Sequence, residues 1–571
     1  MNNRPAGLVS GETLSLRVAE CFILVLTVLY LPYLSISLIT LSAVFVHLFV
    51  CIVYRAQIYP RYIDPLRHLP TANVRTHQNP LLSSRLTNIE QQGGHPIIGH
   101  VLSQFSLPRG EKYLSYVDTV PNDGIIRLRG FLNSSQLLLT NAEALKEVLV
   151  RKAYEFEKPS GERDFLRVIL GEGLVVSEGD FHKYQRKRVL PSFSLRQIKG
   201  LHNIFWRMSQ TFSTSVEHCI REQIMDSDNY QFLSGVVDID NWAPRITLDI
   251  IGIAALGREF NSLQNSDDAL FRAYNTVTAP TLKNLGSLGL YAYGPRWLAS
   301  GLSRQLGMND TANMLRVYSH QFLEDKRTAV EADPDRHFDI LSELLKSGEF
   351  TDTDLVDQLL TFIAAGHETT SSTFSWVIYL LALHREVQER LRDEIDAHVH
   401  QIGTNASGAE IAAILDSLPV LNAVCNETLR LYPTVPISFR VPNRDTSILG
   451  YPVRKGTRII ISPWAINRSR QHWGPDADKF VPERWIDPKT GKPNNTGGAT
   501  NNYSLLTFLH GPRSCIGQSF AKAELKCLIV AFLTAFEVLD LCSAGPVVPG
   551  GAVTTKPIGG MQVRLKIRNK I

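Results

Sequence analysis

The sequence lacks the cysteine arrangements that are typical of a disulfide scaffold or a zinc site. Its seven cysteines are scattered over 571 residues, their number is odd, and no two of them form a C-x-x-C pair. This usage fits a protein of a reducing compartment. A large excess of charge is also absent, because the net charge of +4 is too small to suggest a nucleic-acid-binding protein.

Sequence features that would separate one domain from another are missing as well. Residues 95–571 contain no linker, no block of like charge and no internal repeat. Length alone would allow about three domains. The composition, with 44% hydrophobic and 20% charged residues, is that of a globular protein with ample material for a large core.

One stretch of the chain has no formal charge. Residues 21–54 contain no Asp, Glu, Lys or Arg over 34 positions. A membrane-spanning helix needs about 20 apolar residues, so this stretch is too long for one ordinary helix and rather short for two. The apolar core of a signal peptide has only about 7–15 residues. We therefore predict an N-terminal segment at 1–20 and a transmembrane anchor at 21–54, as one long span or two short ones.

The residues after this stretch predict its orientation. Arg55, Arg61 and Arg67 follow it, and a positively charged flank lies in the cytosol. Proline interrupts helices and stiffens a chain. Residues 55–94 are therefore predicted to be a connector, and residues 95–571 a cytosolic domain. The connector carries Pro60, Pro65, Pro70 and Pro80.

A run near the C-terminus carries the clearest chemical signal. Phe508, Gly511, Arg513, Cys515 and Gly517 fit the pattern F-x-x-G-x-R-x-C-x-G. Apolar residues resume at helical spacing after Gly517, so a helix is predicted to begin there. A cysteine just ahead of a helix N-terminus is close to its dipole and free amides, which lowers the pKa of the thiol. The run resembles the haem-binding loop of the cytochromes P-450.

This resemblance implies that Cys515 is the thiolate ligand of a haem b iron. Such a ligand pushes electron density onto the metal and favours cleavage of the O–O bond. Arg513 would pair with a haem propionate, and Phe508 and Gly517 would contact the cofactor. Two alternatives remain open: a buried structural cysteine in a Gly-Pro turn, or iron ligation by the imidazole of His510.

Residues 351–382 are predicted to form a long and mostly apolar helix. Within it, the Thr369 hydroxyl can bond to the Ala365 carbonyl and bend the helix, and Gly366 suggests a tolerated distortion. The run Ala-Gly-His-Glu-Thr-Thr resembles the oxygen-activating motif of the P-450 central helix. The resemblance implies that Thr369 steadies dioxygen and that Glu368 helps to deliver protons. The alternative is an ordinary buried helix whose threonine bonds back to the backbone.

Two further segments resemble parts of the same family. Glu427 and Arg430 form an E-x-x-R pair, and Arg484 lies in the segment Pro482-Glu483-Arg484-Trp485. In the family these three residues form a buried charge triad, and loss of one member of such a cluster costs about 3–5 kcal/mol. By itself, E-x-x-R is also a common surface pair.

Three more basic residues are candidate partners of the haem propionates. His182 and Arg186 share one helix face in a segment that resembles the family's W-x-x-x-R helix, with His182 where many members have Trp. Arg440 matches the arginine of the strand after the E-x-x-R helix. The alternative for the basic run around His182 is a solvated helix face.

The resemblance implies a mostly helical P-450 fold with small β-sheets, preceded by the anchor and built as one large domain at 95–571. The implied reaction inserts one oxygen atom of O2 into an organic substrate and releases the other as water. The chain ends 56 residues after Cys515, too few for a fused flavin reductase. Electrons are therefore expected from a separate NADPH–cytochrome P-450 reductase.

The expected location is the endoplasmic reticulum membrane, with lipid around the anchor and the catalytic domain in the cytosol. The predicted substrate-lining segments are Phe165–Val176, Val435–Phe439 and Thr554–Pro557. They are mostly apolar and predict a lipophilic substrate. The anchor type and the wording of the motifs resemble those of eukaryotic members of the family, which implies a role in fungal secondary metabolism. Two alternative functions are a P-450-type isomerase or dehydratase that does not use external O2, and a membrane haem-binding protein without turnover. The intact Glu368-Thr369 motif favours the monooxygenase.

Overall fold

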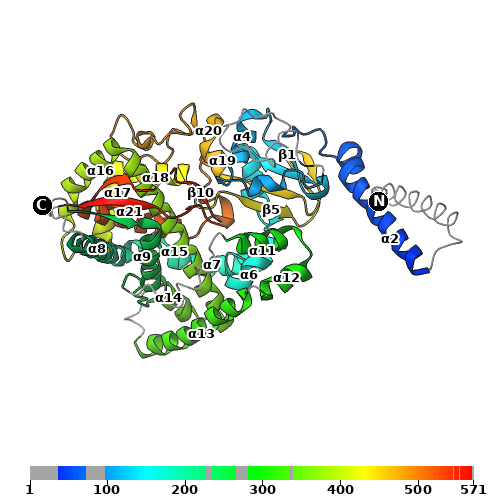
Figure 1. Cartoon of the computed structure of the whole chain (residues 1–571). Coiled ribbons are helices and arrows are strands. Elements are labelled where there is room, and N and C mark those ends of the chain that lie inside the picture. The colour runs from blue at the N-terminus through cyan, green and yellow to red at the C-terminus, as the bar shows by residue number, and fades with distance from the viewer. Residues whose placement is uncertain are drawn as a thin grey trace, which may run out of the picture. The chain divides into compact units, whose positions relative to one another are not determined.

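The computed structural model describes residues 36–72, 95, 97–226, 233–264, 281–305, 307–333, 339–543, 545–551 and 553–568. These residues form a mostly helical protein with small sheets (Figure 1), as the sequence predicts. The chain divides into two compact units, Met1–Leu102 with Arg127–Gln136, and Ser103–Ile126 with Leu137–Ile571. The second unit holds most of the predicted domain. The predicted segment 1–20 and residues 21–35 of the predicted anchor lie outside the described residues.

In the first unit, helix α2 (Ile36–Val53) continues into the π-helix η2 (Tyr54–Ile63). The stretch Thr40–Ile63 is long and apolar enough to cross a membrane. Among the described residues, the bent pair α17 (Gly408–Ser417) and α18 (Pro419–Leu431) passes the same test of length and composition. Most of α18 is buried in the protein.

Pro60 lies inside η2 and does not end the helix, which continues to Ile63. A proline has no N–H, so Pro60 cannot donate a hydrogen bond to the helix backbone. Here the Ala56 carbonyl accepts a hydrogen bond of 2.6 Å from Nδ2 of Asn133. The carbonyl of Pro60 accepts one from Arg127, which also pairs with Asp64 at 2.9 Å. These contacts supply the backbone partners that the sequence alone does not reveal.

The second unit is built around α15 (Asp352–Leu383), which is buried along most of its length. Thr351 and Asp354 form a capping box at its start, in which each side chain accepts from the other residue's backbone N–H. A helix that is apolar on nearly all sides is stable only when it is enclosed by other elements. The sequence prediction of a helix over 351–382 is confirmed to within one residue.

Aromatic side chains of α15 and of two further helices meet in the main core. The helix α21 (Gln518–Ala535) follows the Cys515 loop, as predicted, and packs on α8 (Leu195–Asp226). Phe212 of α8, Phe374 of α15 and Phe532 of α21 meet with ring centroids 5.5–5.9 Å apart. Aromatic contacts of this kind bury large apolar areas and fix the helices relative to one another.

The other described helices have the following bounds: η4 (Val101–Gln104), α4 (Glu111–Thr119), η5 (Phe131–Asn133), α5 (Ala142–Lys146), η6 (Glu147–Arg151), α6 (Ser160–Leu170), α7 (Gly179–Val189), η7 (Leu190–Phe193), α9 (Ile239–Ile251), η8 (Gly252–Leu256), α11 (Leu282–Tyr293), α12 (Arg296–Gln305), α13 (Met308–Ala332), α14 (Ile340–Ser347), α16 (Arg385–His398), η10 (Val399–Gln401), α19 (Pro463–Arg468), α20 (Arg470–Trp473), η11 (Pro482–Trp485), η12 (Asn502–Ser504) and η13 (Gly511–Arg513).

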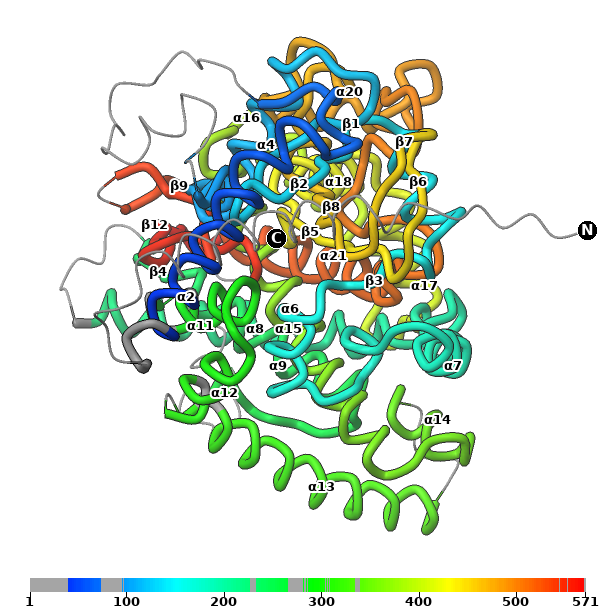
Figure 2. The backbone as a smooth tube through the Cα atoms, turned by 90° about the vertical axis from the view of Figure 1, so that its right-hand side faces the viewer, coloured from blue at the N-terminus to red at the C-terminus, as the bar shows by residue number. Residues whose placement is uncertain are grey.

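The sheets of the second unit are small and mostly antiparallel. Strand β5 (Ser438–Pro442) pairs with β8 (Arg458–Ile461) and with β3 (Phe156–Glu157). A second sheet places β12 (Gln562–Ile567) between β4 (Ser234–Asp238) and β9 (Phe536–Leu541) (Figure 2). Two-stranded pairs join β10 (Pro549–Gly550) to β11 (Lys556–Pro557) and β6 (Thr446–Ile448) to β7 (Tyr451–Val453). The remaining described strands are β1 (Ile125–Arg129) and β2 (Ser135–Leu139).

Candidate active site

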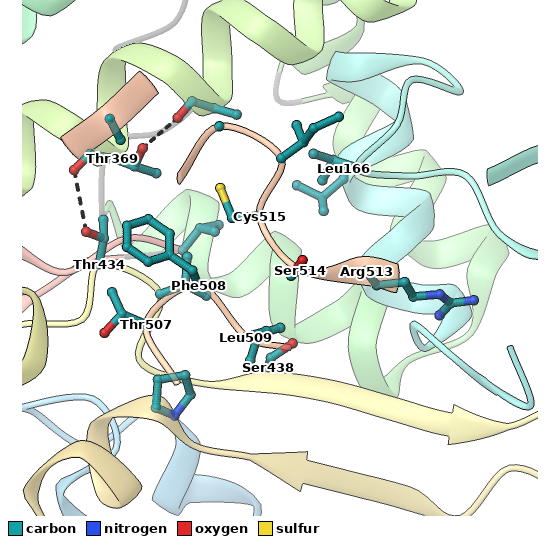
Figure 3. Close-up of a pocket in the computed structure, with 18 of the residues that line it drawn as sticks. Leu166, Thr369, Thr434, Ser438, Thr507, Phe508, Leu509, Arg513, Ser514 and Cys515 are labelled. Atoms are coloured by element: carbon teal, nitrogen blue, oxygen red, sulfur yellow. Dashed lines mark hydrogen bonds between the residues drawn. The ribbon is translucent and has the colours of Figure 1, made fainter. Parts of the chain in front are cut away.

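A cavity of about 510 Å³ lies inside the second unit, between α15, the loop before α21, α6 and β5. Its wall is mostly apolar. Thr369 and Cys515 both line it, and Figure 3 shows the thiol of Cys515 on the side of its loop that faces Thr369. Two motifs that are far apart in the sequence therefore open onto one enclosed space.

The cysteine loop is held by its own backbone. The N–H of Cys515 donates to the Phe508 carbonyl at 2.9 Å, and the N–H of Ser514 donates to the Gly511 carbonyl at 3.0 Å. Gly511 has φ +78°, and a Cβ there would lie 2.1 Å from the carbonyl oxygen of Leu149. Only glycine fits this position. The loop therefore presents Cys515 in a fixed orientation at the N-terminus of α21.

The predicted lowering of the Cys515 pKa is wrong for the protein alone. Burial raises the pKa of this thiol and outweighs the Gly517 amide and the charge of Arg186, which both lower it. The exposed surface of Cys515 faces the cavity and not bulk water. An apolar cavity disfavours a bare thiolate, so a positive centre bound to the sulfur is needed to offset the burial.

His510, the alternative ligand, points elsewhere. It is not among the residues that line the cavity, and its Nε2 lies 2.9 Å from the Asn502 carbonyl and 3.1 Å from that of Leu505. Phe508 and Gly517 do line the cavity, as predicted.

Thr369 makes the predicted bond back to the helix. Its Oγ1 donates to the Ala365 carbonyl at 2.6 Å, and its own carbonyl accepts from Thr373 and Thr434. Gly366 has a packing role that the sequence did not reveal, since a Cβ there would lie 2.6 Å from Cδ1 of Ile251 on α9. The helix runs through this motif without interruption.

Glu368 is buried but does not line the cavity. Its Oε1 accepts a hydrogen bond of 2.9 Å from Oγ1 of Thr554 and lies 2.9 Å from Nζ of Lys556. The structure therefore places the predicted pair Glu368 and Thr369 side by side on α15, with only Thr369 on the cavity wall.

Seven of the residues that line the cavity are basic. Five of them act on one another and form a basic cluster: Lys158, His182, Arg186, Arg440 and Arg513. The other two are Arg109 and Lys522. Burial and the charge of Arg513 lower the pKa of Arg440 to about 10. Burial lowers the pKa of His182 to about 3, and Lys158 is the next cause. Burial lowers the pKa of Lys158 to about 8, although Glu178 opposes this. These shifts have a common cause, which is positive charge crowded into a space with little water.

One carboxylate lies within this cluster. Glu178 accepts hydrogen bonds from the backbone N–H and Nζ of Lys158 and forms an ion pair with Arg513. Arg513 also donates to the Phe156 carbonyl at 2.8 Å, yet its buried Nε has no partner. Arg186 donates to the Ser514 carbonyl at 2.7 Å. Excess positive charge beside a cysteine suits a flat ligand that carries a metal and carboxylates, so the residues fit haem.

The predicted charge triad forms as expected. Glu427 lies 2.8 Å from Arg430 and 3.0 Å from Arg484. Arg430 also donates to the carbonyls of Asn467 and Ala477, and Nε1 of Trp485 donates to Glu427 at 2.8 Å. The side chains of Glu427 and Arg430 have no exposed surface.

Sequence reasoning missed Lys158 and Glu178, and it included Lys556 only within a predicted substrate-lining segment without a role. None lies in a recognised motif, and each reaches its partners only through the fold. Of the predicted substrate-lining segments, Val435–Phe439 lines the cavity throughout and Phe165–Val176 does so in part. In the C-terminal turn the lining residue is Val553, just before the predicted segment Thr554–Pro557.

Comparisons with known proteins agree with this geometry. The family model described as Cytochrome P-450 matches residues 92–557. The cytochrome P-450 monooxygenase ptmK of Penicillium ochrochloron is 36% identical over 517 residues, which cover 90% of this chain and 96% of that protein. The cytochrome P-450 monooxygenase sphH of Aspergillus fumigatus is 39% identical over 491 residues, or 85% of each chain. The cytochrome P-450 monooxygenase abl5 of Leptosphaeria maculans is 36% identical over 543 residues, or 92% of each chain.

Proposed function

Because this chain belongs to the cytochrome P-450 family, whose similar members are monooxygenases, we propose that it inserts one atom of O2 into a lipophilic substrate. The observation that carries this proposal is the shared cavity of Cys515 and Thr369, with a cluster of basic side chains in an otherwise mostly apolar wall. Haem bound through a cysteine thiolate supplies the activation of dioxygen.

The chain's own residues have three tasks in this proposal. Cys515 supplies the thiolate, and Arg186, Arg440 and Arg513 bind the propionates, with His182 beside them. The Thr369 hydroxyl holds a proton next to the reacting oxygen. Apolar side chains from α6 and from residues 435–439 exclude water and orient the substrate.

The finer points of the proposal concern partners and location. Electrons come from a separate NADPH–cytochrome P-450 reductase, and Thr40–Ile63 supports a membrane anchor that keeps the catalytic unit at the cytosolic face of the endoplasmic reticulum. The similar enzymes described above come from fungi. We infer a role in fungal secondary metabolism, with terpenoids, polyketides, fatty acids or sterols as substrate classes.

The carbon monoxide difference spectrum of the reduced protein tests the assignment of Cys515. We expect Cys515→Ala to lose the thiolate-type spectrum and His510→Ala to keep it. A thiolate-type spectrum from Cys515→Ala would refute the assignment. A screen of lipophilic compounds for a haem spin-state shift would then identify ligands. NADPH consumption with formation of an oxygenated product separates a monooxygenase from an isomerase and from a protein without turnover.

A further inference from the structure

The carboxylate of Glu368 is on the flank of α15 and not on its cavity face. The residues of α15 that line the cavity are Thr361, Phe362, Ala365, Gly366, Thr369, Thr370 and Thr373. Glu368 is 7% exposed and is enclosed between α15 and the C-terminal turn. Protons that reach Thr369 by way of Glu368 must therefore come from that flank.

The C-terminal turn closes over this carboxylate. Oγ1 of Thr554 donates to Glu368 Oε1 at 2.9 Å, and Nζ of Lys556 in β11 lies 2.9 Å from the same oxygen. The ammonium of Lys556 is mostly buried, with 18% of its side chain exposed. A charge-assisted contact at this depth fixes the direction of the Glu368 side chain.

The turn itself is fastened to the walls of the cavity. The carbonyl of Thr555 accepts from Ser372 and from Nε1 of Trp376, both on α15. The N–H of Thr555 donates to the carbonyl of Thr434 at 2.8 Å. Lys556 is thus held in place by backbone contacts that do not depend on its own charge.

A second carboxyl group, that of Asp240, lies within electrostatic range of Glu368 and Lys556. Asp240 lies in the first turn of α9, where burial raises its pKa to about 6; Lys556 lowers that pKa, and Asp238 and Glu368 raise it. Asp238 accepts from the N–H groups of Asp240 and Met561. His367 of α15 is also buried in this region, with Nδ1 bonded to the Ile363 carbonyl at 2.8 Å, and both Glu368 and Lys556 act on it.

We propose that Lys556 is a positioning residue for Glu368, and that it controls how protons from this flank of α15 reach Thr369. The inference rests on the proposed function. In the proposed reaction, O2, two electrons from NADPH, two protons and the substrate give hydroxylated substrate and water. Glu368 gives a proton to the Thr369 hydroxyl, whose own proton enters the cavity, and the flank of α15 then returns a proton to Glu368.

An infrared titration tests the geometry without substrate or reductase. The holoenzyme should show a protonated carboxyl band that is absent from Asp240→Asn and titrates near pH 6. In Lys556→Met the midpoint should rise by about one pH unit or more, because the ammonium no longer favours the carboxylate. The control Lys566→Met, on β12, should leave the midpoint unchanged. An unchanged midpoint in Lys556→Met would mean that the Lys556 ammonium does not act on these carboxyl groups, and would overturn the proposal.

Oxygen consumption with NADPH and the reductase, without added substrate, tests the role in proton supply. Without substrate, O2, two electrons and two protons give hydrogen peroxide. Lys556→Met should consume oxygen about tenfold more slowly than the parent, with a larger solvent isotope effect and an equal carbon monoxide spectrum. Lys556→Arg should restore most of the rate, and Lys566→Met should match the parent.

Equal rates in Lys556→Met and the parent would overturn the relay, and so would a rate that falls only in proportion to the carbon monoxide spectrum. If the parent itself consumes no oxygen, the proposed function fails. The infrared titration then decides whether Lys556 acts on Asp240 and Glu368.

Discussion

Thr369 is part of the cavity wall, and the bond of its hydroxyl to the Ala365 carbonyl keeps its proton close to the helix. We expect Thr369→Ala to bind haem and ligands normally but to form severalfold less product per NADPH, with the electrons released as hydrogen peroxide. Thr369→Ser keeps the hydroxyl and should stay close to the parent. Thr361→Ala, on the same cavity-lining face, is the matched control. Equal product per NADPH in Thr369→Ala and the parent would remove the hydroxyl from the mechanism.

The raised pKa of Asp240 predicts that the free energy of unfolding depends on pH. Burial raises its pKa to about 6, whereas the unfolded chain has about 3.9. Between these values the folded state binds more protons than the unfolded state, so this group makes the protein less stable as the pH rises. Asn cannot ionise. The shift of about two pH units corresponds to about 3 kcal/mol, so Asp240→Asn should be more stable than the parent at pH 7 by up to about that amount.

Urea unfolding followed by circular dichroism measures this effect. The stability difference between Asp240→Asn and the parent should shrink as the pH falls from 7 towards 4. A difference that stays constant over this range would mean that the Asp240 carboxyl titrates alike in the folded and unfolded states.

Among the structural elements, η11 and α18 are joined by the buried triad of Glu427, Arg430 and Arg484. Arg430→Met leaves the Glu427 charge with one partner fewer and should lower the free energy of unfolding by about 3–5 kcal/mol. The surface pair Arg390 and Glu483 joins the neighbouring α16 to the same η11. Arg390→Met is the matched control, and a change of about 0–1 kcal/mol is expected. Similar losses in the two variants would argue against a buried clamp.

The N-terminal helix predicts two different outcomes for two truncations. Deletion of residues 2–53 removes α2 but keeps the contacts of Ala56, Pro60 and Asp64 within the first unit. This variant should leave the membrane fraction and stay folded. Deletion of residues 2–64 also leaves Arg127 buried without its carboxylate, and should lower Tm by several degrees.

Fractionation in alkaline carbonate and thermal unfolding separate the two effects. A 2–53 deletion that stays in the membrane fraction would contradict the assignment of α2 as the anchor. Equal Tm values for the two truncated proteins would show that the pair of Asp64 and Arg127 contributes little to stability.

Local sequence patterns predicted the helices better than they predicted the contacts of the site residues. The helix over 351–382 was predictable because its cap and its apolar run are both local, and the start of a helix after Gly517 was predictable because the apolar spacing there is local. The direction of Glu368 was not, since Lys556 reaches it from 188 positions further along the chain. Lys158 was missed for the same reason: its charge matters only beside Arg440 and Arg513, which the fold brings to it.

For the whole molecule, orientation in the membrane can be tested with sequons that the chain already carries. Asn405 and Asn502 are exposed, whereas Asn133, Asn426 and Asn467 are buried. If the catalytic unit is cytosolic, no sugar is added to any of them, and glycosidase treatment should leave gel mobility unchanged. A signal peptide fused to residues 64–571 is the positive control, since Asn405 and Asn502 then enter the lumen. Glycosylation of either residue in the natural chain would place the unit on the lumenal side.

The cluster of five basic side chains also affects how much of this protein a cell accumulates. Like charges in a dry space repel one another, so the chain alone is strained at this cluster. A dianionic ligand that binds only the folded form relieves the strain and shifts the balance towards that form. Chains made faster than haem is synthesised would remain in the less stable state, open to degradation. The yield of this protein in a host should therefore follow the supply of haem precursors more closely than the level of its messenger RNA.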